Sequence, residues 1–299
     1  MIKVKVPASS ANMGAGFDAL GIALNLYSVL EVSETESGLE IVTFTSGGTV
    51  QNDKTNLVYR SMQRVFNEVG FSPRGIKIRQ ESHIPMTRGL GSSSACIVGG
   101  MLAANVMSGR PLKYPDILTL AADMEGHPDN VGPALYGGIC ISVKTGDGVV
   151  SKSTKLMHKL KFAVMIPDFF VATRKSRGAL PDMISIKDAA TNISSALMFY
   201  RSIIEGDFKM LRYGVADKIH QPYRKKYIDG FDEIFDKTYE YGSLATYLSG
   251  SGPTIMSILD GNAEEFSSRM RRFFCEGSHK WRCMILECDN VGSVVSVTD

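Results

Sequence analysis

The sequence predicts an α+β fold built as two lobes. Segments typical of strands and helices are mixed along the chain but do not repeat as βαβ units, which argues against a doubly wound parallel sheet. The 299 residues suffice for two lobes with separate cores. Apolar residues make up 44% and charged residues 21% of the chain, and these ordinary values argue against a largely disordered protein.

The charge balance argues against a nucleic-acid-binding protein. The 33 basic and 31 acidic residues give a net charge of +2, and the basic residues are scattered apart from clusters at 174–177 and 224–226. No run of about 18 apolar residues could span a bilayer, and the N-terminus lacks the apolar core of a signal peptide. We therefore expect a cytoplasmic protein with no nucleic-acid and no membrane partner. The five cysteines, an odd count without a C-x-x-C pair, favour buried thiols.

The first half of the chain predicts strands and helices separated by glycine-rich loops. Val4 and Val6 alternate with lysines as in a strand, and residues 7–10 are expected to break it before a loop over 11–21. The apolar spacing in 56–69 fits an amphipathic helix that ends at Gly70. The other predicted elements are strands at 24–32, 39–44 and 76–78, a turn at 46–48, helices at 96–107 and 114–124, and a polar turn at 125–130.

The second half begins after a connection rich in Lys, Ser and Gly. Residues 145–159 separate predicted strands at 138–143 and 162–166, so we place the boundary there and predict domains over 1–155 and 156–299. The remaining predicted elements are helices at 186–204, 208–219 and 231–241, a glycine-rich turn at 248–254 and a strand at 255–259.

Residues 85–95 have the composition of an anion-binding turn. Gly89 and Gly91 allow the backbone to approach a ligand, and the helix that follows offers first-turn N–H groups without intrahelical partners. The turn is not a Walker A loop, because Ser92 stands where that loop has lysine. Alone it fits simple helix capping better. Together with the glycine-rich loops at 10–18 and 249–253, it predicts one phosphate site assembled from three loops.

Four segments resemble the signature motifs of the GHMP small-molecule kinases. They are Pro-Ala-Ser-Ser-Ala-Asn-Met-Gly-Ala-Gly-Phe-Asp (7–18), Gly-Leu-Gly-Ser-Ser (89–93), Glu-Gly-His-Pro-Asp-Asn-Val (125–131) and Leu-Ser-Gly-Ser-Gly-Pro-Thr (248–254). The first and third, with His-Gln-Pro-Tyr-Arg (220–224), resemble the homoserine kinases within that superfamily. The resemblance implies an ATP-binding N-terminal lobe like ribosomal protein S5 and a ferredoxin-like C-terminal lobe. It further implies transfer of the ATP γ-phosphate to L-homoserine, giving O-phospho-L-homoserine for threonine biosynthesis.

The resemblance also implies which residues bind the nucleotide and its metal. Ser93 and an acidic residue would hold Mg²⁺. Glu125 is the first choice for that acid and Asp123 the second, since the two lie about 200° apart on a helix and cannot share a face. The sequence does not give the residues that contact adenine, for which Asn56 and Leu57 are candidates. The implied ATP-binding residues are Pro85, Met86, Thr87, Arg88, Gly89, Leu90, Gly91, Ser92, Ser93, Ser94, Ala95, Gly250, Ser251 and Gly252.

The implied acceptor site combines carboxylates, amides and arginines. Arg177 and Arg224 match the arginines that bind the substrate carboxylate, and a guanidinium suits a carboxylate better than an ammonium does. Asp18 and Asn130 are the implied catalytic residues. Asn130 cannot accept a proton usefully, so we expect Asp18 to orient the hydroxyl and not to act as a base. The implied substrate-binding set is Asn12, Asp18, His127, Asp129, Asn130, Arg177 and Arg224.

Several alternatives stay open at the level of sequence. One is another kinase of the superfamily, of the mevalonate or shikimate type. Others are a nucleotide-binding relative without turnover and a related diphosphate decarboxylase. Ser94 stands where many members have alanine, with no clear effect on the phosphates. The sequence does not give the oligomeric state and leaves a homodimer open.

Overall fold

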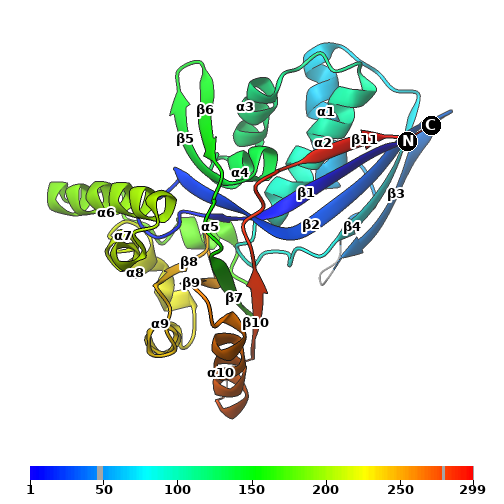
Figure 1. Cartoon of the computed structure of the whole chain (residues 1–299). Helices are drawn as coiled ribbons and strands as arrows, with labels where there is room; N and C mark the ends of the chain where they lie inside the picture. Colours follow the sequence, from blue (N-terminus) through cyan, green and yellow to red (C-terminus); the bar gives the residue numbers. More distant parts are fainter. Residues whose placement is uncertain (46–49, 278–279, 299) are drawn as a thin grey trace.

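The computed structural model describes residues 1–45, 50–277 and 280–298, and within them the chain forms two sheets with flanking helices (Figure 1). The predicted α+β class is confirmed. The first sheet has the order β11-β1-β2-β4-β3, with β5 paired to β2 and β6 to β5. All of its pairs are antiparallel except β3 with β4. Its strands are β1 (Ile2–Ala11), β2 (Leu20–Thr35), β3 (Gly38–Thr45), β4 (Gly75–Ser82), β5 (Ile139–Thr145), β6 (Gly148–Thr154) and β11 (Val294–Val297).

The half of the chain that contains the first sheet also contains the helices α1 (Leu57–Val69), α2 (Ser92–Met107), α3 (Tyr114–Glu125) and α4 (Val131–Tyr136). The helix α2 contacts α1, α3, β1 and β2, so it is enclosed on most sides. Its apolar and small residues suit that place, because a helix that is apolar all round has to be buried. The enclosed position fixes the direction in which its N-terminus points.

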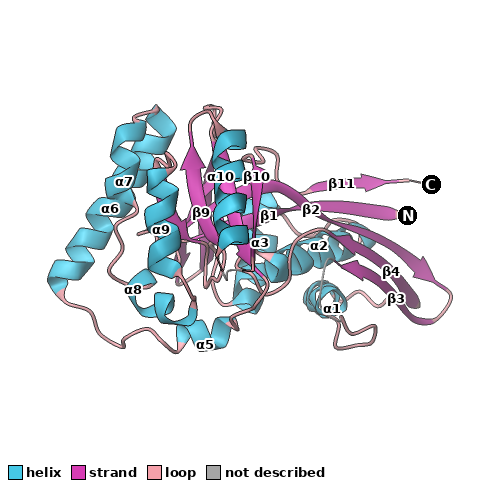
Figure 2. Cartoon of the chain, turned by 90° about the horizontal axis from the view of Figure 1, so that it is seen from below, coloured by secondary structure: helices cyan, strands magenta, loops and turns pink. Residues whose placement is uncertain are grey.

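The second sheet is antiparallel, with the order β10-β7-β9-β8. Its strands are β7 (Lys161–Pro167), β8 (Ala245–Leu248), β9 (Ile255–Leu259) and β10 (Trp281–Leu286). The helices α9 and α10 pack on its strands, while α6 extends away from it (Figures 1 and 2). The helices of this half are α5 (Thr173–Arg177), α6 (Ile186–Glu205), α7 (Leu211–Gly214), α8 (Gln221–Arg224), α9 (Phe231–Glu240) and α10 (Ala263–Glu276), with short 3₁₀ turns at Phe208–Met210 and Lys225–Tyr227.

The chain crosses between the sheets twice. It leaves the first sheet after β6, and it returns after β10 to place β11 beside β1. The predicted division into 1–155 and 156–299 remains a prediction about domains, and the topology adds that β11, from the second range, completes the first sheet. The two ends of the chain therefore lie close together (Figure 1).

Three predicted elements differ from the structure. The expected strand break at 7–10 is wrong, because β1 continues to Ala11 and accommodates Pro7 at an irregularity between Pro7 and Ala8. The predicted connection at 145–159 contains β6, which pairs with β5 at the edge of the sheet. Its many polar residues lack the apolar pattern from which a strand is predicted. The helix predicted at 208–219 ends at Gly214. The predicted turn at 46–48 lies outside the described residues.

The turn at 125–130 lies against β2, the strand that pairs with β1. A Cβ atom on Gly21 of β2 would lie 1.8 Å from the backbone oxygen of Asp129. The two backbones touch only because residue 21 has no side chain. None of the described helices is both long and apolar enough to cross a membrane.

We expect Gly21→Ala to destabilise the protein by about 1–3 kcal/mol or more, because the methyl group forces two packed backbones apart. Thermal unfolding measures the effect as a lower Tm. Gly146→Ala is the matched control, since a Cβ atom there meets nothing within 4 Å. Equal Tm values for the two variants would contradict this close approach.

Candidate active site

A cleft of about 340 Å³ is lined by residues of both halves of the chain. Its lining comes from residues near α1 and β4, from the turn at 85–95, and from the loops at 12–18 and 125–130. Asn56 and Leu57 are part of the lining near α1. The lining residues are Ala11, Asn12, Asp18, Thr45, Val50, Gln51, Thr55, Asn56, Leu57, Val58, Gln80, Ser82, Met86, Thr87, Arg88, Gly89, Gly91, Ser92, Ser93, Cys96, Glu125, His127, Asp129, Asn130, Thr173, Arg177, Arg224, Gly250 and Ser251.

The three glycine-rich loops converge at this cleft, as the sequence predicts. The hydroxyl of Ser249 donates to the backbone oxygen of Gly89 at 2.5 Å and lies 2.7 Å from the hydroxyl of Ser10. The N–H of Gly250 donates to the backbone oxygen of Ala11 at 3.0 Å. Ser249 and Gly250, which lie in the third loop, thus connect it to both the first and the second loop.

The turn at 85–95 has the backbone that its composition predicts. Gly89 and Gly91 have φ values of +77° and +68°, in the left-handed region that favours glycine. A Cβ atom on Gly91 would lie 2.1 Å from the hydroxyl oxygen of Ser9. Helix α2 begins directly afterwards, at Ser92, with Gly91 as its N-cap. Its free N–H groups and the positive end of its dipole lie beside the cleft, a setting suited to phosphate.

Not all of the predicted nucleotide residues reach the cleft. Met86 to Gly89, Gly91 to Ser93, Gly250 and Ser251 line it, whereas Pro85, Leu90, Ser94, Ala95 and Gly252 do not. The hydroxyl of Ser94 is buried and has no hydrogen-bond partner among the described residues. The extra hydroxyl at this position therefore points into the protein and away from the cleft.

The two candidate metal acids are in different places. The hydroxyl of Ser93 donates to Glu125 Oε1 at 2.5 Å, and both residues line the cleft. Asp123 is exposed and is not among the lining residues. A hydroxyl and a carboxylate oxygen beside the start of α2 are hard ligands of the kind that Mg²⁺ takes. The site therefore fits the ion through Ser93 and Glu125.

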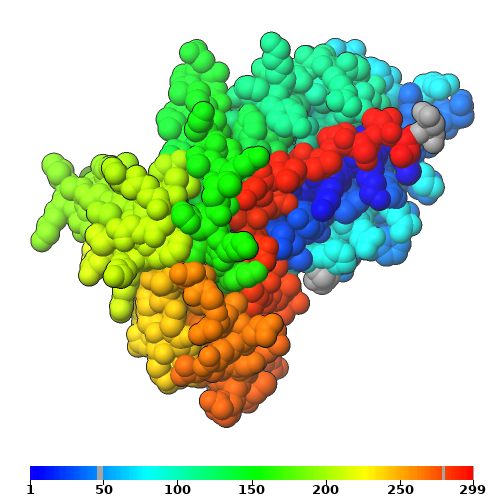
Figure 3. Space-filling view, in the orientation of Figure 1, coloured from blue at the N-terminus to red at the C-terminus, as the bar shows by residue number. Residues whose placement is uncertain are grey.

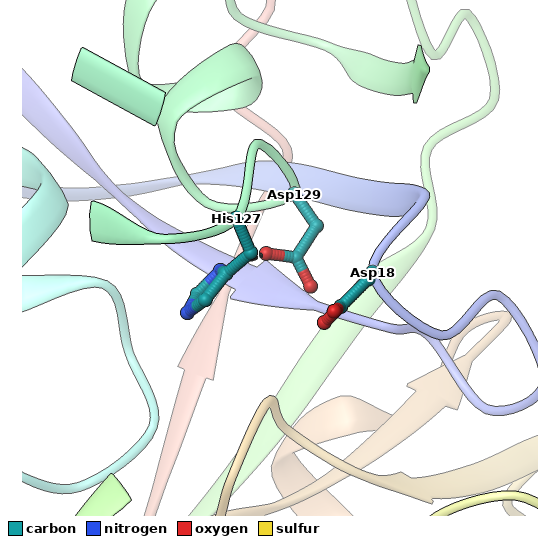
Figure 4. A group of neighbouring side chains, drawn as sticks. All are labelled: Asp18, His127 and Asp129. Atoms are coloured by element: carbon teal, nitrogen blue, oxygen red, sulfur yellow. Dashed lines mark hydrogen bonds and ion pairs between the residues drawn. The ribbon is translucent and has the colours of Figure 1, made fainter. Parts of the chain in front are cut away.

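The acceptor end of the cleft contains a cluster of charged side chains. Asp18, His127 and Asp129 place one polar atom each within 4.8 Å of one another (Figure 4). Arg177 donates to both carboxylate oxygens of Asp18, at 3.1 and 2.8 Å. His127 Nδ1 lies 2.5 Å from Asp129 Oδ1. Negative and positive groups thus alternate across this end of the cleft.

The neighbours of His127 favour its charged form. Burial lowers the pKa of His127, but the hydrogen bond and the negative charge of Asp129, with the charge of Glu125, outweigh burial and raise the pKa above its ordinary value. The raised pKa favours a protonated imidazole, which offers no lone pair to a metal, and both carboxylate oxygens of Asp18 already accept from Arg177. The cluster is therefore better suited to a charged organic ligand than to a metal ion.

Arg224 is buried, with 2% of its surface exposed, and it reaches the cleft from α8. Its Nη1 donates to the backbone oxygen of Gly250 at 2.8 Å and lies 3.2 Å from His220 Nδ1. Its Nε has no hydrogen-bond partner among the described residues. Burial, followed by the positive charge of Arg177, lowers the pKa of Arg224 to about 10, so the guanidinium stays charged at neutral pH. A buried cation with an unused N–H needs an anion.

His220 supports Arg224 as a neutral base. It is fully buried, and burial lowers its pKa, with Arg224 adding to the effect against the carboxylate of Asp217. Its Nε2 lies 2.8 Å from the backbone oxygen of Gly14, which can only accept, so Nε2 carries the proton and Nδ1 accepts from Arg224. His220 thereby connects the first loop to the arginine.

Phe17 lies between the two arginines of the acceptor end. Its ring stacks on His220 at 5.6 Å, and the guanidinium carbons of Arg177 and Arg224 lie 5.8 and 5.5 Å from its centroid. The negative faces of an aromatic ring attract cations. The ring therefore offsets part of the repulsion between two neighbouring positive charges. Neither Phe17 nor its contacts can be recognised from the sequence, because nothing in the Gly-Phe-Asp triplet indicates which charges meet the ring.

Asn12 and Asn130 have their amides occupied in different ways. Asn12 donates to the backbone oxygen of Gly250 at 3.0 Å and accepts from the N–H of Asp18 at 3.0 Å, so its amide joins two loops. Asn130 accepts from the hydroxyl of Ser9 at 2.9 Å through Oδ1. Its NH₂ group has no such partner in the described chain, and Asn130 lines the cleft. Sequence reasoning does not identify Ser9, because it lies in the segment that is predicted to break the first strand.

We expect Asp129→Asn to lower the pKa of His127, because burial is then opposed only by the more distant charge of Glu125. The wild-type pair should stabilise the fold fully below the pKa of an unfolded histidine and lose this effect as the pH rises through the raised pKa. NMR titration of the imidazole measures both variants. Glu125→Gln is the control with a smaller fall, and an unchanged pKa in Asp129→Asn would contradict the pairing.

Comparison with known proteins agrees with this geometry. The family model of the GHMP kinases N-terminal domain matches residues 56–138 and that of the GHMP kinases C-terminal domain matches residues 199–275. Homoserine kinases of Caldicellulosiruptor saccharolyticus and Clostridium acetobutylicum are each 45% identical, over 99% of this chain and 96% and 100% of their own lengths. The crystal structure of homoserine kinase from Cytophaga hutchinsonii is 28% identical with a TM-score of 0.86, covering 99% of this chain and 97% of that one.

The fold is shared more widely than the sequence. The mevalonate kinase of Methanococcus jannaschii, 15% identical, has a TM-score of 0.69 over 96% of this chain and 98% of its own. This likeness concerns the fold alone. The two-lobed α+β fold expected from the motifs is thus confirmed. With 45% identity along nearly its whole length, the chain belongs to the homoserine kinase family of the GHMP kinases.

Proposed function

We propose that this chain transfers the γ-phosphate of ATP to the hydroxyl of L-homoserine, giving O-phospho-L-homoserine for threonine biosynthesis. One observation carries the proposal: a phosphate-binding helix start opens into the same cleft as two arginines and two aspartates. The arginines suit a carboxylate and the aspartates an ammonium group. A small zwitterion with a hydroxyl near the phosphates matches this arrangement.

The nucleotide would lie along the cleft from α1 to the turn at 85–95. Asn56 and Leu57 line the cleft near α1 and would lie beside the base, and the N–H groups at the start of α2 would bind the phosphates. Ser93 and Glu125 would hold Mg²⁺. When bound, that ion offsets negative charge on the phosphate oxygens.

The acceptor would lie between the two arginines and the first loop. Arg224 offers its unused N–H groups to the carboxylate. The two bonds to Asp18 use two of the five N–H groups of Arg177, which leaves donors for the same carboxylate. Asp18 would orient the hydroxyl, and Asp129 adds negative charge for the ammonium group.

Transfer would depend on alignment more than on proton abstraction. The transition state of phosphoryl transfer is largely dissociative, so the hydroxyl proton can leave late. Because Ser9 holds Oδ1 of Asn130, the NH₂ group faces the cleft and can donate to an oxygen of the reacting group. We assign Asn130 this donor role and Asp18 the orienting role.

An ADP-release assay with homoserine, mevalonate and shikimate tests the proposal. Homoserine alone should be phosphorylated, N-acetyl-homoserine and homoserine amide should be poor acceptors, and removal of Mg²⁺ with EDTA should stop the reaction. Preferred turnover of mevalonate or shikimate would reject the acceptor. ATP binding without turnover of any acceptor would reject catalysis, and carbon dioxide release from a diphosphate substrate would indicate a decarboxylase.

We expect Arg224→Ala to raise the KM for homoserine about 10- to 100-fold, since a hydrogen-bonded charge on the carboxylate is lost. The KM for ATP should stay within about threefold by the same reasoning, as Arg224 lies at the acceptor end. Arg174→Ala is the matched control, because Arg174 is exposed and does not line the cleft. Arg224→Met keeps apolar bulk and controls for folding. Equal KM changes for both substrates would contradict the assignment.

A further inference from the structure

The side chain of Arg88 is bonded to the protein itself, although Arg88 lies in the turn at 85–95 and lines the cleft. Its Nε donates to the backbone oxygen of Pro167 at 3.1 Å, and its Nη2 donates to that of Asp168 at 2.7 Å. Its Nη1 donates to the backbone oxygen of Met86 at 3.2 Å and to the hydroxyl of Thr87 at 3.3 Å. These bonds use up to four of the five N–H groups of the guanidinium.

Pro167 and Asp168 give this side chain a fixed anchor. Pro167 is the last residue of β7, an inner strand of the second sheet that pairs with β9 and β10. It lies opposite Trp281 in β10, and the N–H of Asp168 donates to the backbone oxygen of Lys280 at 3.0 Å. Backbone that is paired inside a sheet opens less readily than a loop does. Arg88 is thus bonded to a part of the second sheet that shifts little.

The turn at 85–95 is also attached to the first sheet and to the third glycine-rich loop. The backbone oxygen of Leu90 accepts from the N–H of Ser9 in β1 at 3.2 Å, and that of Arg88 accepts from the N–H of Thr254 at 3.3 Å. In the space-filling view the yellow and orange segments lie below the blue and cyan ones, with green and red segments between them (Figure 3). The turn therefore bridges the two halves of the chain, and the Arg88 side chain joins it to β7.

The surroundings of the Arg88 guanidinium suit a planar fork better than a point charge. Burial, followed by the positive charge of Arg282, lowers the pKa of Arg88, while the charge of Asp168 opposes this effect. The guanidinium carbon lies 5.9 Å from the centroid of the Phe170 ring. A guanidinium can donate in several directions within one plane, whereas the ammonium of a lysine cannot span several separate oxygens.

We propose that Arg88 is a positioning residue for phosphoryl transfer. By holding the turn at 85–95 against the end of β7, its side chain sets where the N–H groups at the start of α2 meet the phosphates of ATP. Arg88 has this role only if the chain uses ATP, so the assignment rests on the proposed function. On the sequence alone Arg88 is expected to bind the nucleotide, but in the structure its side chain is bonded to protein oxygens. Because a displacement of about 1 Å can cost about 100-fold in rate, the hold of one side chain on this turn is enough to affect catalysis.

Steady-state kinetics of Arg88→Ala tests this role. The KM for ATP should rise about 10-fold or more and kcat should fall, while the KM for homoserine stays within about threefold. A smaller folded fraction alone would lower kcat and leave both KM values unchanged, so the KM for ATP decides. Arg282→Ala is the matched control with wild-type kinetics, because Arg282 is a neighbouring exposed cation that does not line the cleft. An unchanged KM for ATP in Arg88→Ala would overturn the proposal.

Arg88→Lys separates the position of the turn from the charge near it. The lysine variant should have a KM for ATP close to that of Arg88→Ala, since one ammonium group cannot reach Pro167, Asp168 and Met86 together. A wild-type KM for ATP in Arg88→Lys would mean that the charge alone matters, and would overturn the positioning role. The lysine variant also carries the test if circular dichroism shows that Arg88→Ala does not fold.

Calorimetric titration with Mg²⁺ and a non-hydrolysable ATP analogue, in the absence of any acceptor, separates this role from the proposed function. The wild-type chain should bind the analogue, and both Arg88 variants should bind it about 10-fold more weakly. A wild type that binds no nucleotide would reject the proposed function and the role of Arg88 together. A wild type that binds the analogue, with Arg88 variants that bind it equally well, would reject the role of Arg88 alone.

Discussion

The site depends on the junction that Ser249 and Gly250 make between three loops. Glycine-rich loops have little side-chain packing of their own, so their shape has to be held from outside. Here the holding groups are one hydroxyl and a few backbone atoms: Ser249 reaches Gly89 and Ser10, and Gly250 accepts from Asn12 and donates to Ala11. Because the third loop belongs to the second sheet, the contact also sets how the two sheets meet. The phosphate turn and the acceptor loop are thus placed by the same few bonds.

A second constraint is the charge gathered around the acceptor end. Arg177 and Arg224 repel each other, and the lowered pKa of Arg224 reflects both burial and that repulsion. Phe17 and a neutral His220 lie against the guanidiniums without adding a further positive charge. Had His220 been protonated, Arg224 would have lost this acceptor and gained a second cation beside it, in addition to Arg177. Burial of His220 is therefore part of how the arginines are kept in place.

The sequence could predict what depends on local composition. The positive φ of Gly89 and Gly91, the start of α2 and the cap of α1 at Asn56 all follow from residue types at particular spacings. Contacts between distant segments could not be predicted in this way. The fork from Arg177 to Asp18, the support of Asn130 by Ser9 and the return of β11 to the first sheet join residues more than 100 positions apart. The choice between Glu125 and Asp123 likewise needed the orientation of α3, which helical periodicity alone does not give.

The bond between Asp18 and Arg177 bears on which acceptor the proposed reaction would prefer. A zwitterion brings its carboxylate to the spare donors of Arg177 and its ammonium group to Asp129, which lies within 4.8 Å of Asp18, so each added charge meets an opposite one. An acceptor that has only a carboxylate would add a negative charge that Arg177 has to share with Asp18, and Asp18 would be left only partly compensated. Leaving a hydrogen-bonding group unsatisfied costs about 1–3 kcal/mol, and more when the group is charged. At about 1.4 kcal/mol for each tenfold change, that penalty amounts to a preference of one to two orders of magnitude or more. Discrimination in favour of an amino acid would then follow from the arrangement of charges in the cleft, without a pocket shaped for the ammonium group itself.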